Sequence, residues 1–184
     1  IIDTVTYRFD GAGYLKPGFT QIFLVSAVGG SPRQLTFGDR NHGGEIEWSP
    51  EGRTILISGN RDENWELDAI DSEVYAIDVQ SGSISALTDR NGPDFGAQIS
   101  PDGRRIAYLG YDDREMAYQQ SGLYLMDADG SNHRRIAAGF DRDFSSLEWT
   151  DAGLFAGYED EGVYKVARVT IGGDVRPTSA TVIG

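Results

Sequence analysis

The chain repeats one turn motif about every 50 residues, and this repeat constrains its fold more than any other feature of the sequence. The string Trp48-Ser49-Pro50-Glu51-Gly52 returns as Ile99-Ser100-Pro101-Asp102-Gly103 and, in weaker form, as Trp149-Thr150-Asp151-Ala152-Gly153. Proline presets one turn residue, and glycine adopts backbone angles that other residues resist. Each string therefore predicts a tight turn between two strands.

Two further elements recur behind each turn. The first is an apolar run with an aromatic residue near its centre, at positions 23, 75, 124 and 164. The second is a closing Leu-Thr, at Leu35-Thr36 and Leu87-Thr88, which loosens to Ile136-Ala137 in the third copy. Apolar and polar residues partly alternate within these runs, as in strands with two unlike faces. Each unit therefore reads as four short strands.

Units of about 40 to 50 residues with four strands each are typical of β-propeller blades. We predict an all-β chain of about four antiparallel blades, with approximate ranges 1–40, 41–92, 93–141 and 142–184. The first unit is irregular, because Tyr7-Arg8-Phe9-Asp10-Gly11 replaces its Ser-Pro turn. The chain starts without Met, and Thr181 to Gly184 is expected to begin another strand. We therefore expect part of a seven- or eight-bladed ring, with a complete four-bladed ring as the alternative.

Charge and composition exclude several classes of partner and chemistry. Asp and Glu number 29 against 16 Lys and Arg, and the net charge of −13 argues against nucleic acid or an anionic membrane as partner. The chain has no cysteine, which excludes disulfides, thiolate metal sites and cysteine nucleophiles. The sequence contains neither a signal-peptide pattern nor a stretch near the roughly 20 apolar residues that span a bilayer. We expect a cytoplasmic protein.

Strand residues are the expected core between blades. Apolar side chains of the aromatic-centred runs and the tryptophans before the turns are predicted to be buried there: Val74, Ile77, Leu123, Leu125, Val163, Trp48 and Trp149. Trp65 lies in a polar insertion instead. It is expected either to plug that insertion onto a blade or to line a rim.

The sequence offers no complete catalytic set. Its closest approach to Gly-x-Ser-x-Gly is Gly82-Ser83-Ile84-Ser85-Ala86, which lacks the second glycine and the strand-turn-helix setting of a nucleophile elbow. His42 and His133 are the two available bases, and both are expected to be solvated loop residues. The acidic segments 68–73 and 112–113 lack EF-hand spacing. We predict no catalytic residue, no metal and no cofactor for this chain.

The order of strands in a blade places its long connections on one face. In a four-stranded antiparallel blade, the second-to-third-strand and blade-to-blade connections share a face, and both kinds are long in this sequence. Long loops concentrate binding contacts, although an ordinary solvated face is the alternative interpretation. The candidate contact residues of this face are Arg40, Arg61, Asp62, Glu63, Trp65, Asp112, Asp113 and Arg114.

These motifs resemble two groups of known propellers. The turn-and-strand Ser100-Pro101-Asp102-Gly103-Arg104, the run Leu123-Tyr124 and the closing Leu-Thr resemble the blades of TolB-like propellers. They are also similar to the N-terminal propeller of the prolyl oligopeptidase family of serine peptidases. Residues 7–14 and 58–63 look like an irregular blade start and an Asn-Arg-Asp loop of acylaminoacyl-peptidase-like members. The fourth unit departs from the pattern, because it has lost its proline.

The resemblance to peptidases implies a partner domain and a role. Such peptidases carry their Ser, Asp and His on a C-terminal α/β-hydrolase domain, which the propeller shields from all but short peptides. By resemblance, this chain is a non-catalytic segment that gates peptide access and docks that domain. The alternative is a TolB-like or WD-type propeller that binds proteins and has no enzymatic role.

The ends of a partial propeller are expected to be apolar. Terminal blades without a neighbour would expose residues such as Tyr7 and Phe23 at one end and Tyr164 and Val166 at the other. Large apolar patches are rarely left open on a monomer. We therefore expect the chain to pair with a second copy through its terminal blades.

Overall fold

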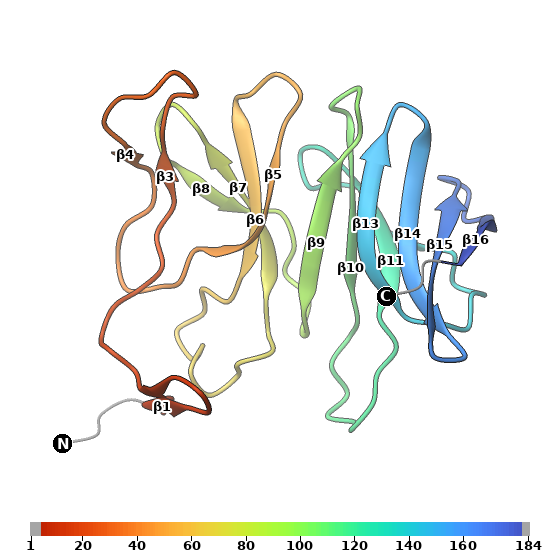
Figure 1. Ribbon diagram of the computed structural model, residues 1–184, viewed down its shortest axis with the longest axis horizontal. Helices are drawn as coiled ribbons and strands as arrows, with labels where there is room; N and C mark the ends of the chain where they lie inside the picture. Colours follow the sequence, from red (N-terminus) through yellow and green to blue (C-terminus); the bar gives the residue numbers. More distant parts are fainter. Residues whose placement is uncertain (1–4, 182–184) are drawn as a thin grey trace.

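Three four-stranded antiparallel sheets and two short strand pairs form the computed structural model, which describes the backbone of residues 5–181 and the side chains of residues 5–178 (Figure 1). This confirms the predicted all-β fold built from four-stranded blades. None of the described residues forms a helix that could cross a membrane. The sheets comprise, in order, β5 (Gly43–Trp48), β6 (Thr54–Gly59), β7 (Glu73–Asp78) and β8 (Ile84–Ala86); β9 (Asp94–Ile99), β10 (Arg105–Gly110), β11 (Gly122–Asp127) and β12 (Arg134–Ile136); and β13 (Phe144–Thr150), β14 (Gly153–Asp160), β15 (Val163–Val169) and β16 (Val175–Thr181).

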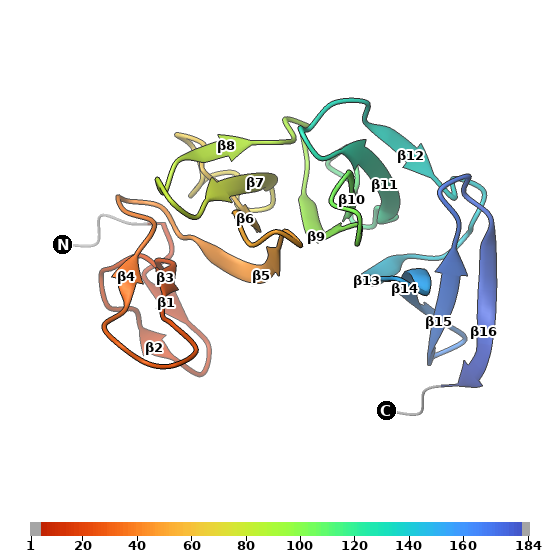
Figure 2. The same ribbon diagram turned by 90° about the horizontal axis from the view of Figure 1, so that it is seen from above.

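The sheets stand side by side as the blades of an open crescent. Figure 2 shows β5, β9 and β13 on its concave side and β8, β12 and β16 farther out. No sheet joins the first strands to the last ones within residues 5–181, so the described part of the chain does not close into a four-bladed ring. The final residues of the expected extra strand, 182–184, lie outside the described residues, and Thr181 ends β16.

Serine and glycine explain why the repeated turn has its sequence. Ser49 Oγ accepts hydrogen bonds from the amides of Arg53 and Thr54, and Ser100 Oγ accepts one from Arg105 at 2.9 Å. Gly52 and Gly103 donate back to the serine carbonyls and adopt a φ of 70°, which favours glycine. The same four-residue string therefore closes the same turn at the start of both blades.

The closing threonine has a structural role as well. Thr88 is buried, and its hydroxyl accepts a hydrogen bond of 2.8 Å from the amide of Val74. Thr36 does the same for the amide of Ile22 at 2.8 Å. A buried amide without a partner is costly, so this residue fixes the join between the third strand of a blade and the residues after its fourth.

Apolar side chains fill the spaces between neighbouring blades. Ile55, Ile57 and Ile77 of the first complete sheet pack on Ile22 and Leu35 of the preceding unit. The next two junctions are built in the same way, and that between the last two sheets holds the largest cluster. The predicted core residues Val74, Ile77, Leu123 and Leu125 are all buried, whereas Val163 is half-buried.

The first unit departs from the predicted four strands. It contains two separate pairs, β1 (Arg8–Phe9) with β2 (Gly13–Tyr14) and β3 (Phe23–Leu24) with β4 (Arg33–Gln34). The β3–β4 pair carries the aromatic-centred run and the residues before Leu35-Thr36, so it corresponds to the third and fourth strands of a blade. The four predicted blade ranges stay a prediction of the sequence.

The missing inner strands change the environment of Trp48. Trp48 pairs with Ile55, whose side chain faces the first unit, and Trp48 is 46% exposed. The equivalent Ile99 is 6% exposed, because it lies against a complete sheet. The prediction that Trp48 is buried core was therefore wrong. Trp149 packs partly buried against the core of the last junction, as predicted.

Candidate functional site on the loop face

The long connections gather at one end of the blades, here called the loop face. In Figure 1 the β6–β7 and β10–β11 connections hang below the sheets, while the β5–β6, β9–β10 and β13–β14 turns lie above. These two long connections span residues 60–72 and 111–121. The β14–β15 turn at this end is short, so the last blade contributes less to the face.

All the candidate contact residues lie in connections at this end. They come from the β4–β5, β6–β7 and β10–β11 connections, and the structure divides them into separate groups: Arg40; Arg61, Asp62, Glu63 and Trp65; and Asp112, Asp113 and Arg114. Their role in binding stays a prediction. Asp113 serves its own loop, because its carboxylate accepts hydrogen bonds from the Glu115 amide and the Gln119 side chain.

The side chain of Arg61 makes contacts within the protein. Its guanidinium contacts Nε2 of His42 and lies 5.6 Å from the ring centroid of Tyr75. His42 is completely buried, so the expectation of a solvated loop histidine was wrong. Burial and the Arg61 charge lower the pKa of His42, which favours a neutral ring. The glycines after His42 led to that expectation, but the chain turns inward at this point.

Trp65 lies on a short turn that begins at Asp62. Its ring meets Phe19 edge to face at 6.2 Å between centroids, and it walls a cavity of about 430 Å³. Asn60 and Glu66 of the same connection and Thr20 and Asn41 of the first unit also line this cavity. Trp65 thus both packs on the first unit and lines a rim.

A buried ion pair stands at the start of β9. Asp94 is fully buried and binds Arg90, whose guanidinium carbon lies 3.8 Å from the ring centroid of Tyr124. Burial raises the pKa of Asp94 to about 6, although Arg90 opposes the shift. Glu73, in the preceding blade, has its pKa raised to about 7 by burial and by nearby carboxylates. This charged cluster joins the first two complete blades.

Arg90 belongs to a recurring dipeptide that the sequence interpretation missed. Three of the four Asp-Arg dipeptides, Asp39-Arg40, Asp89-Arg90 and Asp141-Arg142, lie in the connections that enter first strands, and the fourth, Asp113-Arg114, lies in the β10–β11 connection. Each of the first three arginines forms an ion pair: Arg40 with Asp39 at 3.1 Å, Arg90 with Asp94, and Arg142 with Asp160 at 2.8 Å. Arg40 was among the candidate contact residues, and the spacing of about 50 residues could have identified Arg90 and Arg142 as well.

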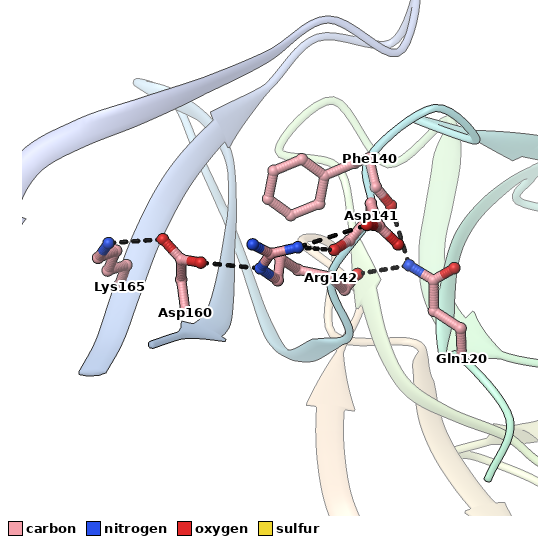
Figure 3. Close-up of polar contacts among 6 residues, drawn as sticks. All are labelled: Gln120, Phe140, Asp141, Arg142, Asp160 and Lys165. Atoms are coloured by element: carbon pink, nitrogen blue, oxygen red, sulfur yellow. Dashed lines mark hydrogen bonds and ion pairs between the residues drawn. The ribbon is translucent and has the colours of Figure 1, made fainter. Parts of the chain in front are cut away.

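Arg142 is the centre of a polar network that ties the last two blades together (Figure 3). Its Nε donates to Asp160, whose other carboxylate oxygen accepts from Lys165 Nζ at 2.7 Å. Gln120 Nε2 donates to the carbonyls of Phe140 and Arg142, both at 2.9 Å. The hydrogen bonds from Lys165 and Arg142 lower the pKa of Asp160. The network thereby links the β10–β11 and β12–β13 connections to the β14–β15 hairpin.

An acidic cavity of about 540 Å³ adjoins this network. Tyr118 and Gln120 form one wall, and Tyr118 donates its hydroxyl hydrogen to Asp143. The other lining residues are Asp141, Arg142, Asp143, Glu159 and Glu161. Four carboxylates against one arginine give this cavity a negative field that attracts basic groups.

The described residues do not form a nucleophile–base pair. Ser83 lies in the β7–β8 turn and bonds to Ser81 at 2.9 Å, far from any strand-to-helix elbow. His133 is exposed, and its Nδ1 lies 2.9 Å from the hydroxyl of Tyr108. Within residues 5–181, no three His, Asp or Glu side chains converge as they would around a metal ion.

Comparison with known protein families identifies the family to which this chain is related. The sequence profile of the dipeptidyl peptidase IV N-terminal region matches residues 12–118, which is more than half of the chain. The chain belongs to this family. Among curated relatives, the uncharacterised protein Atu1656 of Agrobacterium fabrum is 31% identical over 134 residues, and YidR of Escherichia coli is 30% identical over 95 residues. The match to Atu1656 covers 69% of this chain and 40% of that protein, and the match to YidR covers 50% and 20%.

Solved structures place this family member among propellers. A putative TolB from Agrobacterium tumefaciens superposes with a TM-score of 0.67 at 24% identity, over 87% of this chain and 56% of that one. Puromycin hydrolase superposes with a TM-score of 0.64 at 20% identity, over 92% of this chain and 29% of that one. The propeller of the Trilobed protease from Pyrococcus furiosus gives 0.56 at 14% identity, over 87% and 48%. These likenesses establish the propeller fold.

Proposed function

We propose that this chain is a propeller segment of a prolyl-oligopeptidase-type serine peptidase, and that its loop face gates peptide access and docks an α/β-hydrolase domain. The observation that carries the proposal is the match to the dipeptidyl peptidase IV N-terminal region over residues 12–118. Likeness to puromycin hydrolase over 92% of the chain, and over only 29% of that protein, agrees with a larger enzyme around this segment.

The loop face supports the gating part of the proposal. It carries the long connections, and the Arg142 network links two of these connections to the end of β14. A fixed wall of loops restricts which peptides pass, because an extended chain must fit between loops that do not move apart. Short peptides are the proposed substrates, and a cytoplasmic location stays a prediction of the sequence.

Two measurements on the full-length product of the parent gene test the proposal. A fluorophosphonate should label one serine outside the 184 residues of this chain, whereas the isolated chain should stay unlabelled. In the labelled enzyme, Arg142→Ala should raise kcat/KM for long peptides relative to short ones, because the network no longer fixes the loops. Arg53→Ala, in the turn at the opposite end, is the matched control.

A second candidate function is favoured by a separate observation. The putative TolB is 24% identical to this chain and superposes on 87% of it, and that protein is described as a TolB and not as a peptidase. A TolB-like scaffold would use the loop face to bind a protein, without an enzymatic role. A parent protein that has no hydrolase domain and takes no fluorophosphonate label would favour the scaffold over the peptidase.

A further inference from the structure

A smaller cavity lies beneath the β10–β11 connection and differs in charge from the acidic one beside it. Its volume is about 230 Å³, and it shares the wall formed by Tyr118 and Gln120 with the acidic cavity. Three tyrosines, one methionine and two arginines form most of its lining: Tyr111, Tyr118, Tyr124, Met116, Arg114 and Arg135. Aromatic rings and guanidinium groups thus face the same small space.

The fold holds Arg135 at this cavity. Arg135 of β12 is the cross-strand partner of Tyr124 in β11, so both side chains lie on the same face of the sheet. Its guanidinium crosses Gly122, where an added Cβ would lie 2.7 Å from Nε and 3.2 Å from Cζ. Glycine at this position leaves the space that the guanidinium occupies.

Neither arginine of the cavity has a partner of its own. Among the described residues, no carboxylate lies within ion-pair distance of Arg114 or Arg135, and neither guanidinium donates to a protein acceptor. The one acidic lining residue, Asp112, lies 3.7 Å from Arg90 and is paired with it. In a chain with a net charge of −13, this cavity keeps two free positive charges.

We propose that this cavity binds a small aromatic carboxylate. The planar guanidinium donates two parallel hydrogen bonds to a carboxylate, which favours Arg135 as its main contact, with Arg114 beside it. The rings of Tyr111 and Tyr118 offer edges and faces on which an aromatic ring packs, whereas the Tyr124 ring already meets Arg90 and Tyr108. The volume is below the roughly 300 Å³ at which pockets for drug-sized molecules begin, so the ligand carries about one ring.

Titration calorimetry on the isolated chain tests the proposal with three probes. 4-Hydroxybenzoate supplies the ring and the carboxylate, 4-hydroxybenzamide supplies the ring without the charge, and inorganic phosphate supplies the charge without the ring. We expect the carboxylate to bind at least tenfold more tightly than either of the others, because loss of a charge-assisted contact costs about tenfold or more in affinity.

Variants locate the binding. Arg135→Gln should weaken 4-hydroxybenzoate binding at least tenfold, whereas Arg104→Gln should leave it unchanged. Arg104 lies in the exposed turn between β9 and β10 at the opposite end and gives the same change of net charge. Gly122→Ala leaves the charge unaltered and displaces Arg135, so it should also weaken binding. Unchanged thermal melts of the three variants would show that they fold.

Other outcomes overturn the proposal. Equal affinity for the carboxylate and the amide would show that the ring alone drives binding, and equal affinity for phosphate would remove the aromatic part of the assignment. A similar loss in Arg135→Gln and Arg104→Gln would reduce the effect to net charge. Absence of carboxylate binding by the unaltered chain would mean that the two arginines are simply solvated.

Discussion

Trp48 and Trp149 occupy the same position in two blades and have different surroundings. Each is paired with the apolar residue at the second position of the second strand of its blade, Ile55 or Leu154. Trp149 packs on a complete blade, and Trp48 faces a unit that has only the two outer strands. The 46% exposure of Trp48 therefore reports the absence of a neighbour. A propeller blade has no finished core of its own, because each face is completed by the next sheet.

The two ends of the crescent show the same contrast. The first unit and the face of β5 expose many large apolar residues, including Phe23 at 54%, Val25 at 64% and Ile46 at 48%. The outer face of the last blade is more polar. There Glu148, Phe155, Arg168 and Arg176 form one cross-strand row, and Tyr164 lies across Gly157 and bonds to Ser146 at 2.6 Å. An aromatic side chain that covers its own sheet depends less on a neighbouring blade.

The largest expected effect concerns the closing residues Leu35 and Ile136, which are 2% and 3% exposed. Each replacement by Ala should cost about 2–4 kcal/mol of local packing. Ile136→Ala should lower the free energy of global unfolding, because Ile136 lies between two complete blades. Leu35→Ala should release only the first unit, so that hydrogen exchange speeds up before residue 43 and the global transition stays in place. Identical exchange patterns in the two variants would contradict the comparison.

Replacement of the two tryptophans should have the next largest effect on stability. We expect Trp149→Ala to lower the free energy of unfolding by about 3 kcal/mol and Trp48→Ala by about 1 kcal/mol, because a ring that is half in water loses less on truncation. Urea denaturation of both variants measures the difference. Equal losses would show that the first unit covers Trp48 in solution, and a larger loss for Trp48 would restore the prediction made from the repeat alone.

The pH dependence of stability should distinguish the junction between the first two complete blades, which holds the charged cluster, from the other junctions. The folded chain holds the proton of Glu73 more tightly than the unfolded chain, because its pKa rises from 4.5 to about 7. The stability that this carboxyl contributes is thus complete below pH 4.5 and is lost as the pH rises towards 7. Glu73→Gln should remove this part of the pH dependence, as melting curves at pH 5 and pH 8 would measure.

Comparing Glu73→Gln with the unaltered chain also separates the effect of Glu73 on stability from an opposing pH dependence that His42 contributes. The lowered pKa of His42 makes the folded state more stable as the pH rises through 6.5, and this contribution is present in both proteins. It therefore cancels in the difference between them. Glu51→Gln, in the exposed turn after β5, is the control for loss of one negative charge. An identical pH profile for Glu73→Gln and the unaltered chain would rule out the proposed protonation.

The smallest expected effect is self-association. Exposed apolar side chains at the first unit should allow two copies to pair, and light scattering at tens of micromolar should then give about twice the monomer mass. Phe23→Ser should weaken pairing more than Tyr164→Ser, because Tyr164 is 39% exposed and already bonded to its own sheet. The reverse order would place the contact at the last blade, and a monomer throughout would contradict pairing.

The sequence by itself determined the blades and their turns. Ser-Pro-x-Gly, the aromatic-centred run and Leu-Thr are local patterns, and each acts through contacts within one blade: Ser49 with Thr54, or Thr88 with Val74. Such contacts recur wherever the string recurs. The burial of Val74, Leu123 and Leu125 was predictable as well, since each of these side chains faces a complete neighbouring blade.

Only the tertiary structure decided what lies opposite each repeated position. The strings around Trp48 and Trp149 predict one environment, and the number of strands in the preceding unit produced two. His42 was expected to be solvated and is buried, and Arg90 was not singled out although it reaches Asp94, Asp112 and Tyr124. A residue's own segment fixes its strand and its face, whereas its burial depends on the neighbouring blade, about 50 residues away in the sequence.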